Sequence, residues 1–72
     1  MMEYTNSEIV RAINEHIHSD RDRRLLCRRL VDGVTFERLG EEFQLSVRQV
    51  KTIVYRGQEK VFAKMLKKLS TD

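Results

Sequence analysis

The sequence predicts an all-α fold: a compact four-helix domain in which a tri-helical core containing a helix-turn-helix is joined to an N-terminal helix. Apolar residues recur at helical spacing through most of the chain. The 72 residues include no proline and only three glycines, and 35% of them are charged, which favours helices over a sheet. A chain of this length holds one small core, so residues 1–72 are expected to form a single domain.

The first helix is expected over about residues 6–18. Thr5 and Glu8 have the spacing of a capping box, in which each side chain binds the other residue's backbone N–H. Isoleucines then recur at i+4 spacing and form an apolar stripe: Ile9, Ile13 and Ile17. His16 and His18 would point in widely different directions on a helix, so we expect surface residues and no shared metal.

The second helix is expected over about residues 20–31, after a cap formed by Ser19 with Asp22. Its inner stripe would consist of Leu26 and Leu30, flanked by other apolar residues: Leu25, Cys27 and Val31. Cys27 is expected to be a small core or boundary residue. Gly33 suits the left-handed conformation that commonly ends a helix.

Four arginines give this second helix a dense basic face: Arg23, Arg24, Arg28 and Arg29. One interpretation is a solvated face paired with nearby acids such as Asp20 and Asp22. The other is a surface that contacts the DNA backbone or a protein partner. The sequence leaves both open.

A helix-turn-helix is expected over residues 35–56. Thr35 would cap its first helix, and the next residues place apolar side chains on one face: Phe36, Leu39 and Phe43. Gly40 lies beside that face, where the second helix is expected to cross closely. Gln44 and Leu45 would form the turn.

Ser46 and Gln49 have the spacing of another capping box and would start the second helix of the motif at Val47. Three residues of this helix would face inward: Val50, Ile53 and Val54. The remaining residues lie near the turn or on the outer side: Ser46, Val47, Arg48, Gln49, Lys51, Thr52, Tyr55 and Arg56. Arginine and glutamine can bind base edges bidentately, and hydroxyl and cationic side chains commonly contact phosphates.

The last helix is expected to continue to about residue 69. Gly57 falls on its inward stripe, which indicates close approach of another helix. Beyond Gly57 lies an apolar band, comprising Val61, Phe62, Met65, Leu66 and Leu69. This band would either cover the first helix or form a homodimer seam.

Charge is unevenly distributed along the chain. Residues 1–47 hold seven Lys and Arg against nine Asp and Glu, whereas residues 48–72 hold seven against two. The positive part coincides with the candidate recognition helix and its extension, as expected for a surface that binds phosphate. A Lys-rich helix end favoured by the helix dipole would explain Lys64, Lys67 and Lys68 equally well, but not Arg48, Lys51 and Arg56. No paired carboxylates, activated nucleophile, phosphate loop or metal-ligand spacing is present, so we expect no enzyme, cofactor or metal site.

The chain carries no signal-peptide pattern and no apolar run long enough to cross a membrane. Its single cysteine excludes an internal disulfide and fits a reducing compartment. A cytoplasmic, nucleoid-associated protein is therefore expected.

Residues from about Ser19 to Val61 resemble region 4 of bacterial sigma factors of the seventy family, including the extracytoplasmic-function branch. The likeness lies in the tracts SDRDRRLL, DGVTFERLGEEF and LSVRQVKTIVYRGQEKV. Arg38, Gln44 and Arg28 depart from the family pattern, which usually has glutamate, glycine and an apolar residue there. No region 2 is found, so the resemblance implies a short sigma-like regulator rather than a complete sigma factor.

The resemblance also implies roles for individual residues. Those carried over as base contacts are Arg48, Gln49, Lys51 and Thr52. Those carried over as phosphate contacts are Thr35, Ser46, Tyr55 and Arg56. In the family, region 4 binds a promoter element and also touches RNA polymerase.

The leading hypothesis is therefore a sequence-specific DNA-binding transcription regulator whose recognition helix starts at Val47. The alternative is a protein-interaction module that binds RNA polymerase or another regulator through the arginines of the second helix or the C-terminal apolar band. The tetrahelical output domain of response regulators shares the motif and is a further variant, one that usually dimerises.

Overall fold

The computed structural model describes residues 4–70, with side chains for residues 4–66, and it is all-helical within that range. In chain order the helices are α1 (Asn6–His16), α2 (Asp20–Leu30), α3 (Phe36–Phe43) and α4 (Val47–Ser70). The predicted fold class is confirmed: the described part of the chain forms four helices and contains no strand.

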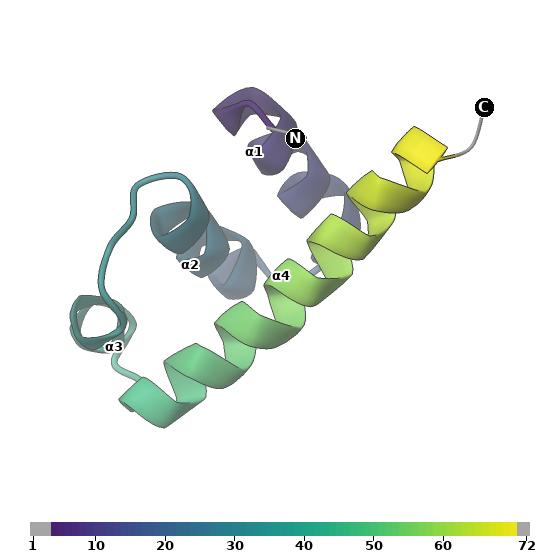
Figure 1. Cartoon of the computed structure of the whole chain (residues 1–72). Coiled ribbons are helices and arrows are strands. Elements are labelled where there is room, and N and C mark those ends of the chain that lie inside the picture. Colours follow the sequence, from purple (N-terminus) through teal and green to yellow (C-terminus); the bar gives the residue numbers. More distant parts are fainter. Residues whose placement is uncertain (1–3, 71–72) are drawn as a thin grey trace.

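The 24-residue helix α4 is the scaffold on which the other helices are arranged. Figure 1 shows them along one side of α4, with α3 near its N-terminal end and α1 beside its C-terminal half. Helix α2 lies between and packs against all three other helices, whereas α1 and α3 do not meet. The molecule is accordingly elongated, with extents of 42 × 21 × 17 Å.

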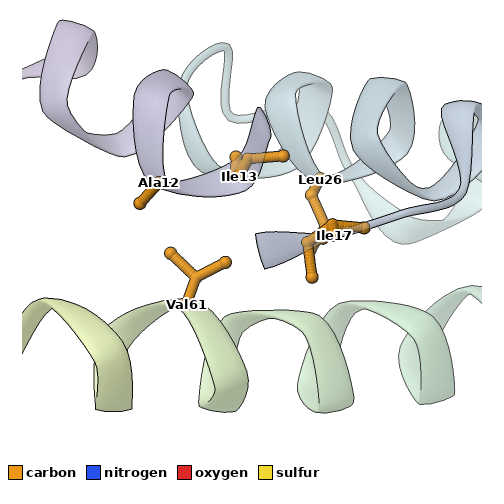
Figure 2. Packing of buried hydrophobic residues seen from close by; sticks show 5 residues of the cluster. All are labelled: Ala12, Ile13, Ile17, Leu26 and Val61. Carbon is orange, nitrogen blue, oxygen red and sulfur yellow. The ribbon is translucent and has the colours of Figure 1, made fainter. Parts of the chain in front are cut away.

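The core consists of two apolar clusters placed one after the other along α4. The first joins α1, α2 and the C-terminal half of α4 through buried residues, namely Ala12, Ile13, Ile17, Leu26 and Val61. Figure 2 shows these five side chains gathered between the helices, with Val61 rising from α4. The second joins α2, α3 and the start of α4 through Leu25, Leu39, Val50 and Val54. The apolar faces predicted for α1, α3 and α4 are those that pack.

The inner stripe predicted for α2 is wrong in one respect. Leu25, expected only to flank the stripe, is fully buried, while Leu30 is only partly buried. The reason is that α2 lies between two groups of helices. Leu26 enters the cluster beneath α1 and Leu25 enters the cluster beneath α3, so two adjacent faces of α2 are covered.

Helix ends depart from the expected ranges by up to two residues. Helix α1 ends at His16 instead of His18, because Ile17 adopts an extended conformation (φ −108°, ψ 120°) that buries its side chain. Helix α2 ends at Leu30, with Val31 as its C-cap. Gly33 follows with φ +70°, as predicted, and the Val34 N–H donates to the Arg28 carbonyl.

Gly57 is placed where the sequence predicted a close approach. A Cβ at this position would lie 2.4 Å from Cδ1 of Leu26, so the absence of a side chain lets α2 rest directly on α4. At Gly40 the near neighbour is not the second helix, as expected, but the turn. A Cβ there would lie 2.7 Å from the Leu45 carbonyl oxygen.

The apolar band of α4 mainly covers α1. Val61 is buried in the first cluster and Met65 packs against that cluster. Phe62 stacks on Tyr4 with ring centroids 6.0 Å apart, whereas Leu66 is half exposed. The side chain of Leu69 lies outside the described residues.

Candidate nucleic-acid interface

The turn between α3 and α4 sets the direction in which α4 leaves. Gln44 adopts the left-handed conformation (φ 56°, ψ 46°), and both Gln44 and Leu45 donate their backbone N–H to the Gly40 carbonyl. Leu45 packs into the second cluster beneath the turn. Gln44 thus takes the conformation that glycine usually provides at this position.

The predicted capping box at the start of α4 is present. Gln49 donates its backbone N–H to Ser46 Oγ at 3.1 Å, and Ser46 donates its backbone N–H to Gln49 Oε1 at 2.9 Å. The Gln49 amide therefore has its oxygen directed at the backbone and its Nε2 donors directed elsewhere. A bidentate contact of Gln49 with adenine would also need Oε1. This oxygen would then have to accept from both the Ser46 N–H and the base, or lose its hydrogen bond to Ser46.

The outer face of α4 carries the predicted base contacts. Arg48, Lys51 and Thr52 are exposed, while Val50 and Val54 on the opposite face are fully buried. The Thr52 hydroxyl donates to the Arg48 carbonyl at 3.0 Å, which leaves its oxygen as an acceptor. Glu59, also exposed, lies between Arg56 and Lys60 further along the helix.

On the side facing α3, the ring of Phe36 organises several of these side chains. The Lys51 ammonium lies 5.7 Å from the ring centroid, and the Tyr55 ring meets Phe36 edge-on at 6.0 Å. Arg29 of α2 lies closer, with its guanidinium carbon 4.2 Å from the same centroid, and donates to the Val34 carbonyl. Cation–π and edge contacts of this kind restrict where the charged groups can move.

Of the residues predicted to contact phosphates, Ser46, Tyr55 and Arg56 lie on the exposed part of α4 or at its cap, and Tyr55 is 52% exposed. Thr35 is exposed at the start of α3, where its hydroxyl accepts the Arg38 backbone N–H. All eight predicted residues are thus exposed, seven of them on α4 or at its N-cap and Thr35 at the start of α3.

Arg21 lies beside predicted contact residues, although the sequence did not indicate it. It lies on α2 but lines a groove together with residues of α4, namely Arg48, Gln49, Thr52 and Ile53. The side chain of Arg21 is 52% exposed and pairs with Asp22, with its Nε 3.1 Å from Oδ1. No local pattern indicates this position, because it depends on the angle at which α2 crosses α4.

The other arginines of α2 are largely engaged within the molecule. Arg28 forms a two-armed pair with Glu42 of α3, its Nε 3.1 Å from Oε2, and also contacts Asp32. Hydrogen bonding to Arg28 lowers the pKa of Glu42 below its ordinary value. Arg23 binds Asp20 and donates to the Ile17 carbonyl. The interpretation of a face paired with nearby acids therefore holds for Arg23 and Arg28.

Arg24 differs, since it is exposed and lies 5.9 Å from the centroid of Phe43. It borders a second groove between α2 and α3, lined also by Asn14, Cys27 and Glu42. Burial, with a smaller contribution from Asp32, raises the pKa of the Cys27 thiol, which makes it a poor nucleophile. Cys27 packs against the first cluster, as expected of a boundary residue.

Within the described residues no group of three or more His, Cys, Asp or Glu side chains is placed to hold a metal ion. Over the same residues, no helix combines the length and apolar character needed to cross a bilayer. Comparisons with protein-family models, with curated proteins and with solved structures gave no match to this chain.

Proposed function

We propose that the protein is a sequence-specific double-stranded DNA-binding regulator of transcription that inserts the N-terminal half of α4 into the major groove. The observation that supports this most directly is the exposure of Arg48, Lys51 and Thr52 on a helix whose opposite face is fixed in the core. A helix held in this way can enter a groove about 12 Å wide without losing its packing.

Individual roles follow from position. Arg48 lies in the first turn of α4 on the outer face and is the chief candidate for a bidentate contact to guanine. Lys51, for which the resemblance implies a base contact, is held with Tyr55 beside Phe36, and in this position both are suited to phosphate on the α3 side of the groove. Gln49 contributes through its Nε2 group while its oxygen caps the helix.

Selection of bound sequences from a random duplex pool, followed by titrations at several salt concentrations, tests this function. We expect Arg48→Ala to relax sequence preference, and Lys51→Ala to weaken binding to all duplexes and reduce the salt slope by about 1. Lys64→Ala, on the part of α4 beside α1, is the matched control. Absence of salt-sensitive binding to any duplex at about 50 mM salt would refute the proposal.

A second candidate function is supported by the groove between α2 and α3. Phe43 and Arg24 border it, and Arg24 forms no ion pair within the described residues, so the groove could receive an acidic segment of a partner protein. Nuclease-resistant capture of RNA polymerase that is lost in Arg24→Glu but kept in Arg48→Ala would favour this function over DNA binding.

Membership of the sigma-like group and homodimer formation remain predictions. Because α1 covers Val61 and Met65, a dimer seam would have to be built around Leu66. Sedimentation of wild-type protein and of Leu66→Lys with and without a selected duplex would show whether two copies bind together.

A further inference from the structure

The cationic surface does not end at the outer face of α4 but continues into a groove between α4 and the start of α2. The groove is lined by residues of α2, of α4 and of the segment between α1 and α2, among them Ser19, Arg21, Asp22, Thr52, Arg56 and Lys60. Its charged side chains are Arg21, Arg56 and Lys60 against the single carboxylate of Asp22. Neither Arg21 nor Lys60 was indicated by the sequence as a site residue.

This groove lies next to the one beside the recognition residues. Arg21, Thr52 and Ile53 line both grooves, so the two follow each other along α4, from Arg48 in its first turn to Lys60 more than three turns later. Thr52, Arg56 and Lys60 follow at i+4 spacing, a row that turns by about 40° at each step, so all three still border α2. The next member of the row, Lys64, borders α1 instead.

Cationic and hydroxyl-bearing side chains thus lie on both sides of the outer face of α4. We call these two groups the α3 flank and the α2 flank, after the helix that each one borders. The α3 flank consists of Lys51 and Tyr55 beside Phe36, with Arg29 near them. The α2 flank consists of Arg21, Arg56 and Lys60. A helix in the major groove has one phosphate backbone on each side, and phosphate contacts fix its orientation without specifying sequence.

We infer that the α2 flank binds the backbone phosphates of the second DNA strand, so that the duplex is held from both sides of α4. This inference rests on the proposed function. Arg21 and Arg56 present guanidinium donors and Lys60 an ammonium, the groups that neutralise phosphate with release of counterions. Asp22 opposes this binding in two ways. Its negative charge repels phosphate, and its Oδ1 atom binds the Nε and Nη2 groups of Arg21.

Salt-dependent titration of a duplex taken from the selected pool tests the α2 flank. We expect Arg21→Gln and Lys60→Gln each to lower the magnitude of the salt slope by about 1, and the double variant by about 2, with sequence preference unchanged. Lys64→Gln removes the same charge from the next turn of α4, on the α1 side, and is expected to leave the slope unchanged.

Asp22→Asn supplies a test in the opposite direction. Removing this carboxylate is expected to strengthen duplex binding by about two- to fivefold, the range of an exposed charge pair. Glu15→Gln raises the net charge equally on the exposed side of α1 and should not change the affinity. Circular dichroism of every variant shows whether the fold is kept.

Failure of the two proposals can be told apart. If wild-type protein binds no duplex, the proposed function itself is overturned. If wild-type protein binds duplex and Arg48→Ala and Lys51→Ala weaken it, while the α2-flank variants match their controls, only the second-strand contact is overturned. If those variants instead abolish nuclease-resistant capture of a protein, the groove binds an acidic polypeptide and the inference is likewise wrong.

Discussion

Gln44 carries the backbone conformation that the turn of the helix-turn-helix needs. A non-glycine residue at φ 56° is strained by roughly 1–2 kcal/mol in the folded state, and glycine would relieve this strain. Glycine also has more conformational freedom in the unfolded chain, which offsets part of the gain. We therefore expect Gln44→Gly to raise the free energy of unfolding by about 0.5–1 kcal/mol in urea titrations. Gln58→Gly, in the middle of α4, should lower it by about the same amount, and a loss at both positions would contradict the argument.

Gly57 allows Leu26 to sit against the backbone of α4. Alanine there would favour the helix by about 1 kcal/mol, but its Cβ would overlap both Cδ atoms of Leu26, and overpacking of this kind costs about 1–3 kcal/mol. Gly57→Ala should therefore destabilise the protein. In a Leu26→Val background, where the side chain is shorter, the same change should become neutral or stabilising. If a double-mutant cycle gave the same effect of Gly57→Ala on stability in both backgrounds, the contact between position 57 and Leu26 would not be the cause of that effect.

At the scale of helices, the pair between Arg28 and Glu42 links α2 to α3 at the surface. Its hydrogen bonds hold the pKa of Glu42 below the ordinary value of 4.5. A lowered carboxyl pKa means that the pair's stabilisation is complete above pH 4.5 and is lost as pH falls through the folded-state pKa.

Acid titration of stability is the corresponding test. Between about pH 5 and pH 2 the free energy of unfolding should fall less steeply in Glu42→Gln than in wild-type protein, since that variant has no carboxylate to protonate. Glu41→Gln, on the neighbouring exposed position of α3, should keep the wild-type slope. If the free energy of unfolding fell equally steeply with pH in Glu42→Gln and in wild-type protein, the pair between Arg28 and Glu42 would make no contribution to stability.

At the scale of the whole molecule, α2 and α4 run through both core clusters and make them one cooperative unit. A domain of this size has only about 4–11 kcal/mol of stability, whereas Ile13→Ala or Leu39→Ala should cost about 2–5 kcal/mol. We expect each change to shift a single unfolding transition, with tyrosine fluorescence and circular dichroism coinciding. Tyr4 lies at the α1 end and Tyr55 near α3, so separate transitions would reveal independent halves.

The sequence was sufficient for features that depend on neighbours within four residues. The capping boxes at Thr5 and Ser46, the left-handed Gly33 and the buried face of α4 were all predicted correctly. Of the features that depend on how helices cross, the close approach at Gly57 was predicted, but others were not. The burial of Leu25 and the place of Arg21 beside Arg48 follow from α2 lying between the other helices, which no local pattern records.

The continuity of α4 limits how this chain can vary. Each residue in a helix turns the next by about 100°, so one residue inserted after Arg56 would rotate Val61 out of register with Val50 and Val54. Point changes on the exposed side carry no such penalty, because those positions do not support the core. Side chains on the outer face can therefore be exchanged one at a time, while the length of the helix between Val50 and Val61 must stay constant.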